Sequence, residues 1–177
     1  MCANFEAIRK NRAFLLDLPE PDQLEFPEDI FPNYPSPLIF SNDGKIEWRS
    51  VNFGMIPKWA KEKSFGKYTY NARTETIADK PSFREAWHKS QFGLIPVETI
   101  FEPKYIEGKS HWYGIAREDG MPFTVAAIYE NAVIAGEQIR SMSMLTINAD
   151  KLQLAVGAYT LFISSNGKTV AKTIVKM

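Results

Sequence analysis

The chain has a single cysteine, Cys2, directly behind Met1. Aminopeptidases remove an initiator methionine when the next residue is small, and removal here would leave an α-amine and a thiol on one residue. Unperturbed α-amines and thiols have pKa values of about 8 and about 8.5, so both have a nucleophilic fraction at neutral pH. Together they can trap an aldehyde, first as an imine at nitrogen and then as a five-membered thiazolidine closed by sulfur. The alternative interpretation is that Cys2 is only a small residue near a terminus.

A second group of candidate residues lies further along the chain, between positions 71 and 84. Asn71 can orient a substrate oxygen or the terminal amine, although an asparagine that starts a helix is usually a cap. Arg73 and Arg84 can each bind a phosphate through two parallel hydrogen bonds. Pairing with Glu75 or Glu85 is the commoner fate of such arginines, and both interpretations stay open.

Glu102 is the third candidate, because it follows Ile100 and Phe101 and precedes Pro103 in an otherwise apolar segment. Contact with apolar side chains disfavours the charged form of a carboxylate, which suits such a group to proton transfer near neutral pH. Neighbours in a strand point to opposite faces, so Glu102 faces solvent instead if Phe101 faces the core.

Metal and cofactor chemistry has little support in the composition. A lone cysteine excludes an internal disulfide framework and a cysteine-based zinc cluster. The two histidines, His88 and His111, are far apart in sequence and do not form a histidine-rich site. We expect His88 on an exposed helix and His111 at the start of a strand, and neither as a catalyst. We therefore expect no metal site and no cofactor.

Charge and length limit the classes of function. The 177 residues suit one domain, and the formal net charge of zero argues against a protein that coats nucleic acid non-specifically. The charges are nevertheless segregated: residues 17–30 hold six acidic and no basic groups, and residues 58–104 hold nine basic and six acidic groups among several aromatic residues. The second stretch is either a local cationic and aromatic face or an ordinary solvated surface.

No apolar run approaches the ~20 residues that cross a bilayer, and no signal peptide is visible, so we expect a cytoplasmic monomer without a membrane partner.

Turn residues divide the chain into short segments with alternating hydrophobicity, which predict hairpins. The predicted hairpins join 38–40 to 46–48 through Asn42-Asp43-Gly44, 112–116 to 123–128 through Glu118-Asp119-Gly120, and 159–163 to 169–175 through Asn166-Gly167. A further strand is predicted over 143–147.

Helical segments are expected to be few and short, over 5–16, 74–79 and 82–90. Ser82 and Glu85 have the spacing of a capping box at the start of the last one. The pattern as a whole predicts one α+β domain over residues 1–177, in which a β-rich curved sheet closes towards a barrel.

Five segments together have a recognisable order. They are Met1-Cys2-Ala3-Asn4, Phe53-Gly54-Met55-Ile56-Pro57-Lys58-Trp59, Asn71-Ala72-Arg73-Thr74-Glu75-Thr76 with Phe83-Arg84, Leu94-Ile95-Pro96 leading to Phe101-Glu102-Pro103, and Ala126-Ala127-Ile128-Tyr129-Glu130. In this order and spacing they resemble the SRAP family, the SOS response-associated peptidases or abasic-site processing proteins. The resemblance covers roughly residues 1–150, and residues 151–177 diverge from it.

The resemblance implies a protein that senses abasic sites in single-stranded DNA in the DNA damage response. Through Cys2, after removal of Met1, it would form a covalent thiazolidine crosslink with the DNA. Asn71 would position the reacting end, and Glu102 would shuttle protons during ring opening and imine formation.

The same resemblance implies a surface for the DNA strand around these groups. Arg73 and Arg84 would hold the flanking phosphates. Trp59, which follows Pro57, would supply a wall on which a base stacks.

One family feature is missing from the sequence. The family usually carries a catalytic histidine in a His-x-Arg-Met-Pro-like segment near its C-terminal end, whereas no histidine follows His111 here. The resemblance implies that this histidine helps to open the deoxyribose and to reverse the crosslink. Two alternatives to the crosslinking protein therefore remain: a single-stranded DNA binding module without the chemistry, and an N-terminal-nucleophile cysteine peptidase that uses Cys2.

Overall fold

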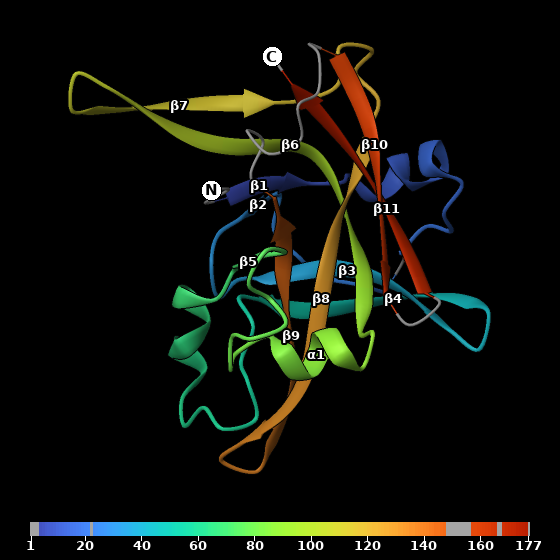
Figure 1. Cartoon of the computed structure of the whole chain (residues 1–177). Helices are drawn as coiled ribbons and strands as arrows, with labels where there is room; N and C mark the ends of the chain where they lie inside the picture. The colour runs from blue at the N-terminus through green and yellow to red at the C-terminus, as the bar shows by residue number, and fades with distance from the viewer. Residues whose placement is uncertain (1–3, 22, 148–156, 166–167, 177) are drawn as a thin grey trace.

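The computed structural model of the chain describes residues 4–21, 23–147, 157–165 and 168–176 (Figure 1). Its elements, in chain order, are β1 (Asn4–Ala7), the 3-10 helix η1 (Lys10–Leu16), β2 (Asp29–Ile30), β3 (Pro35–Asn42), β4 (Lys45–Phe53), the 3-10 helix η2 (Lys63–Tyr68), β5 (Asn71–Arg73), α1 (Arg84–His88), β6 (Phe92–Ile106), β7 (Lys109–Ile115), β8 (Phe123–Ile134), β9 (Glu137–Thr146), β10 (Gly157–Ser165) and β11 (Lys168–Lys176).

Five of these strands close into a barrel. β3 pairs with β4, β4 runs parallel to β9, β9 pairs with β8, β8 pairs with β6, and β6 returns to β3 through Leu94 and Ile39. Closure satisfies the hydrogen-bonding edges that an open sheet exposes. The prediction of a β-rich fold that closes towards a barrel, with a few short helices, is therefore confirmed.

The long strand β6 belongs to two parts of the structure. Its first half, from Phe92 to Val97, pairs with β8 inside the barrel. Its second half extends beyond the barrel between β1 and β7, with β1 paired to residues 97–101 and β7 to residues 100–106. Figure 1 shows this bend, with β6 leaving β8 to run alongside β7. Ile100 and Phe101 are therefore held between two neighbouring strands, whereas Glu102 and the residues after it have their partners in β7.

The core follows from the two-residue period of the strands. In the last part of β8, residues 130, 132 and 134 are buried whereas 131 and 133 are exposed. The largest core cluster contains, among others, Phe5, Phe53, Val97, Val125 and Met144. A second cluster lies under α1 and includes Met55, Ala72, Ile77, Phe83 and Leu145.

The predicted helix over 5–16 is wrong in its first part. Residues 4–7 form β1, and only Lys10–Leu16 is helical, as a 3-10 helix. The side chain of Phe5 is fully buried and its register partner is Ile100. Burial against β6 is available only to an extended chain here, and it outweighs the weak local preference for a helix.

Of the other two predicted helices, the one over 74–79 is wrong and the one over 82–90 is shorter than expected. Residues 74–79 form consecutive turns rather than a helix, and the segment 82–90 contains α1 over Arg84–His88. The capping box is wrong, because the N-cap residue is Phe83 and it makes no side-chain cap bond. The carboxylate of Glu85 is instead bound by Lys58 and Lys89.

The hairpin predictions have different outcomes. β3 and β4 pair up to Asn42 and Lys45 as predicted, and β10 pairs with β11. The hairpin around Glu118-Asp119-Gly120 is wrong, because β7 and β8 both pair with β6. The strand predicted over 143–147 is part of the longer β9. The helices in the described part of the chain are all too short or too polar to cross a membrane.

Candidate functional site

The segment that leads from β4 to Pro57 and Trp59 is attached to β9 by hydrogen bonds. The Gly54 amide donates to the carbonyl of Met142 at 2.9 Å, and the Ile56 amide donates to the Ser141 hydroxyl at 2.7 Å. Pro57 is buried, whereas Trp59 is exposed. The loop is thus a fixed support for the exposed indole.

The end of η2 is attached to the same segment through Thr69, which is buried. The Thr69 hydroxyl donates to the carbonyl of Met55 at 2.5 Å, and the Met55 amide donates back to the Thr69 carbonyl at 3.3 Å. The hydroxyl of Ser143 on β9 also donates to the Thr69 carbonyl. These bonds hold η2 beside the 54–59 segment, so the aromatic side chains of the two can meet.

Trp59, Phe65 and Tyr68 form the aromatic wall. The ring of Phe65 contacts Trp59 edge-on with a centroid distance of 4.9 Å, and Tyr68 with a distance of 6.2 Å. Trp59 is 54% exposed and Tyr68 72%. Large aromatic side chains so exposed are candidates for ligand contact, since burial is their ordinary state.

A cleft of about 400 Å³ opens beside Phe65 and Tyr68 of this wall. It combines aromatic, hydroxyl, amide and cationic side chains, and its lining residues are Phe65, Tyr68, Thr69, Asn71, Arg73, Thr76, Lys80, Pro81, Ser82 and Phe83. Such a combination suits a ligand that has both an aromatic ring and anionic groups.

Asn71 and Arg73 are the two predicted site residues that line this cleft. Both belong to β5, which pairs in parallel with β9 so that Asn71 lies opposite Met144 and Arg73 opposite Thr146. Asn71 therefore begins a strand, and the alternative of a helix cap is wrong. The two residues are two positions apart in β5, which places their side chains on the same side of the strand.

The remaining predicted phosphate-binding residue, Arg84, begins α1 and does not line the cleft. It follows Phe83, which does line it. The carboxylate of Glu85, one of the two partners considered for these arginines, is bound by Lys58 at 2.5 Å and by Lys89 at 2.6 Å. Those two hydrogen bonds, from Lys58 first and then Lys89, lower the pKa of Glu85 to about 2.

Glu102 lies on the second half of β6, directly opposite Tyr113 of β7. It is two residues beyond Ile100 and shares its face of the strand. Ile100 packs against the core cluster that contains Phe5 and Phe53, so Glu102 continues the face of β6 that is turned towards the core. Its side chain is half-buried.

A row of aromatic rings connects this end of β6 with the start of β5. Phe5, the register partner of Ile100, contacts Phe53 at 5.2 Å, and Phe53 contacts Tyr70 at 5.8 Å between ring centroids. Tyr70 directly precedes Asn71. Cys2 lies outside the described residues, two positions before Asn4, whose register partner is Phe101.

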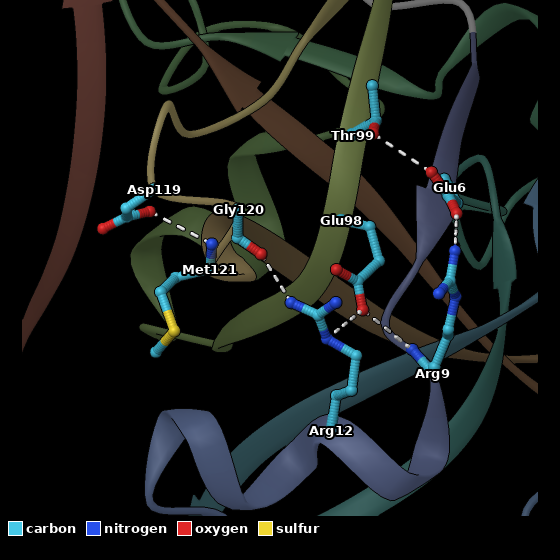
Figure 2. Close-up of polar contacts among 8 residues, drawn as sticks. All are labelled: Glu6, Arg9, Arg12, Glu98, Thr99, Asp119, Gly120 and Met121. Carbon is cyan, nitrogen blue, oxygen red and sulfur yellow. Dashed lines mark hydrogen bonds and ion pairs between the residues drawn. The ribbon is translucent and has the colours of Figure 1, made fainter.

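A polar clamp fixes the segment that follows β1. Arg12 of η1 forms an ion pair with Glu98 of β6 at 3.3 Å and donates to the Gly120 carbonyl at 2.5 Å. The Arg9 amide donates to the same Glu98 carboxylate at 3.3 Å. Figure 2 shows Glu98 between the two arginines, with Gly120 on the far side of Arg12. The clamp holds η1 against β6 and the turn before β8.

The sequence interpretation missed several of these residues. Tyr68 was present in the basic and aromatic stretch 58–104, but nothing distinguished it from the other aromatic residues there. Lys80 was one of the nine basic groups of the same stretch and was likewise not distinguished, and Thr69 had no signal. Among the residues that the structure describes, no three His, Cys, Asp or Glu side chains lie together in a way that could hold a metal ion.

Comparison with known proteins matches residues 1–156 to the sequence model of a family described as SOS response associated peptidase (SRAP). The Bacillus subtilis protein YoqW, named an abasic site processing protein, is 35% identical over 88 residues, which are 49% of this chain and 37% of that protein. The similarly named YobE of the same organism is 31% identical over 111 residues, which are 62% of this chain and 48% of that protein. The matches thus span less than half of the length of these relatives.

Longer matches come from a further relative and from solved structures. YedK of Escherichia coli, also named an abasic site processing protein, is 24% identical over 85% of this chain and 69% of its own length. A crystal structure of a Bordetella bronchiseptica protein superposes with a TM-score of 0.74 at 30% identity, over 98% of this chain and 83% of that one. A Bacteroides thetaiotaomicron protein gives a TM-score of 0.67 at 27% identity, over 85% of this chain and 70% of that one.

Proposed function

This chain belongs to the SOS response-associated peptidase (SRAP) family, and we propose that it senses abasic sites in single-stranded DNA and forms a covalent crosslink with them through Cys2. The observation that carries the proposal is the cleft that Asn71 and Arg73 line together with Phe65 and the exposed Tyr68. Relatives with the name abasic site processing protein support the choice of DNA as the ligand.

The binding part of the proposal follows from the chemistry of the cleft. Arg73 and Lys80 supply positive charge for phosphate oxygens, and Arg84 adds charge next to Phe83 at the rim. Tyr68 and Trp59, the latter two residues after the buried Pro57, supply ring faces for bases. Stacking of bases on aromatic rings tolerates any sequence, because each base has a π-face.

The covalent part of the proposal needs an α-amine and a thiol at position 2. After removal of Met1, the amine of Cys2 attacks the C1′ aldehyde of the ring-opened deoxyribose, and loss of one water gives an imine. The thiolate then adds to the imine carbon while the nitrogen takes up a proton, which closes the thiazolidine. Glu102 would donate the proton that helps the hydroxyl to leave, and Asn71 would orient the amine or the sugar oxygen.

A second function, binding of single-stranded DNA without chemistry, is favoured by one specific observation. The cationic and aromatic residues of the cleft are on η2, β5 and the segment before α1, and none of them depends on Cys2. On this reading an uncrosslinked complex forms with any single strand.

Denaturing gels distinguish the two functions. The full chain is incubated with an oligonucleotide that carries a natural abasic site, and in parallel with one that carries a tetrahydrofuran analogue without an aldehyde. A band shift with the first oligonucleotide alone supports the crosslink. Binding of both in native gels, without a denaturation-resistant band for either, would leave the binding module as the function. Asn71→Ala and Glu102→Gln are expected to slow the appearance of the band without abolishing native binding.

A further inference from the structure

Lys58 lies between Pro57 and Trp59, and its place among the basic residues of 58–104 would suggest a phosphate contact. Its contacts are different. The ammonium nitrogen lies 2.5 Å from Glu85 Oε1 on α1 and 3.6 Å from Glu130 Oε1 on β8. Lys58 thus joins the helix beside the cleft to a strand of the barrel.

Glu130 is the buried member of this group, with only 4% of its surface exposed. Its Oε1 also accepts a hydrogen bond from the Asn131 amide at 2.9 Å. A carboxylate is costly to bury unless a positive group or donors compensate its charge. Lys58 provides that positive charge, so a buried carboxylate on the face of β8 that packs under α1 sets the position of its ammonium group.

Trp59, the next residue, is attached to the same neighbouring segment. Its indole N–H donates to the Pro81 carbonyl at 3.4 Å, and its ring contacts Phe65. Pro81 lines the cleft, and Glu85 lies four residues further on. Two consecutive side chains, Lys58 and Trp59, therefore attach the 57–59 segment to residues 81–85 at two points.

We infer that Lys58 is a positioning residue for the cleft and not a phosphate contact. By bridging Glu130 and Glu85 it fixes the 57–59 segment against α1, and so it sets where Trp59 stands relative to Pro81 and Phe65. The effect on DNA affinity rests on the proposed function, whereas the effect on Trp59 does not.

The placement of Trp59 can be measured without DNA. The protein is labelled with 5-fluorotryptophan, and the fluorine resonance of Trp59 is assigned with Trp59→Phe. Lys58→Met is expected to shift or broaden this resonance and to leave those of the other tryptophans in place. Lys61→Met removes another exposed lysine two residues beyond Trp59 and is the matched control, expected to change nothing. An unmoved Trp59 resonance in Lys58→Met would overturn the inference.

The partners of Lys58 give an independent check on the same signal. Glu130→Gln and Glu85→Gln each remove one of the two carboxylates, and both should move the Trp59 resonance in the same direction as Lys58→Met. Glu85 is on the surface, so Glu85→Gln keeps the check available if the buried substitution prevents folding. A Trp59 resonance that responds to neither partner would overturn the bridging role.

Salt dependence separates positioning from phosphate contact. For single strands, each phosphate contact contributes a slope of about −0.7 to the plot of log K against log salt concentration. Lys58→Met is expected to weaken binding of a single-stranded oligonucleotide several-fold at every salt concentration with an unchanged slope, whereas Arg73→Ala makes the slope shallower. A slope that becomes shallower in Lys58→Met as it does in Arg73→Ala would identify Lys58 as a phosphate contact and overturn the inference.

If the unmodified protein does not bind the oligonucleotide, the proposed function fails, and the fluorine signal alone decides the role of Lys58.

Discussion

Gly54 and Gly66 approach each other so closely that a Cβ atom on Gly54 would lie 2.1 Å from the carbonyl oxygen of Gly66. Gly54 also has a φ of +112°, which side chains disfavour. This contact places the residue after β4 directly against η2, and together with the hydrogen bonds of Thr69 it holds the two segments side by side. The nearest atoms are backbone atoms of Gly66, so the clash of an added methyl group cannot be removed by a side-chain movement.

Gly54→Ala should therefore destabilise the protein by more than about 2 kcal/mol, because a steric clash adds to a backbone strain of about 1–3 kcal/mol. Gly44→Ala is the matched control, since Gly44 also has a positive φ but nothing lies near its Cβ position. Urea unfolding of both variants measures the difference. Equal losses of stability in Gly54→Ala and Gly44→Ala would mean that the contact with Gly66 does not exclude a side chain at position 54.

Arg12→Met is expected to lower the free energy of unfolding by about 1–3 kcal/mol, since it leaves the Glu98 carboxylate without its charged partner. Glu98 is only 10% exposed in its side chain. Arg9→Met is the comparison, because the Arg9–Glu6 pair lies at the surface and such pairs contribute about 0–1 kcal/mol. Thermal or urea unfolding decides, and a larger loss in Arg9→Met than in Arg12→Met would contradict the clamp.

The pH dependence of stability should contain a contribution from Glu85. Its pKa is lowered to about 2 in the folded protein from an ordinary value of 4.5. A lowered folded pKa means stabilisation that is fully present above about 4.5 and is lost as the pH falls towards about 2. The side chain is 45% exposed, so solvent screening keeps the effect small.

Melting temperatures of the unmodified protein and of Glu85→Gln test this between pH 5 and pH 2. The two curves should converge as the pH falls. A Glu85→Gln curve that stays parallel to that of the unmodified protein through this window would argue against the Lys58 and Lys89 contacts.

Tyr68→Ala should weaken binding of single-stranded DNA, because one stacked base contributes about 1–3 kcal/mol. Phe14→Ala removes a comparably exposed ring from η1, away from the cleft, and should leave the affinity unchanged. Fluorescence anisotropy with a labelled oligonucleotide measures both. Equal affinities for Tyr68→Ala and the unmodified protein would place the DNA elsewhere.

Local turn chemistry was enough to predict part of the fold. The Asn42-Asp43-Gly44 turn joins β3 and β4 as expected, because two of its residues adopt positive φ in the structure. The barrel closure depends on the parallel pairing of β4 with β9, in which Asn52 lies opposite Ser141. Local sequence patterns do not predict a pairing between residues so far apart in the chain. The same limit explains the wrong hairpin between β7 and β8, since the long strand β6 offered each of them a partner.

The candidate site was predictable to a similar degree. Asn71 and Arg73 were found because they lie in one short motif, and β5 brings both to the cleft. Lys80 reaches the same cleft only through the turns after β5, which the sequence suggested as a helix. The roles of Cys2 and Glu102 stay predictions, which the variants Cys2→Ala and Glu102→Gln test.

The central claim is tested most directly by the intact mass of the protein before and after incubation with an abasic oligonucleotide. The proposal predicts a protein without Met1, and then an adduct whose mass is the sum of protein and oligonucleotide less one water, with the modification located on Cys2 by fragmentation. Cys2→Ala should give no adduct. An adduct of Cys2→Ala that also equals the sum of protein and oligonucleotide less one water, or a mature chain that retains Met1, would contradict the account.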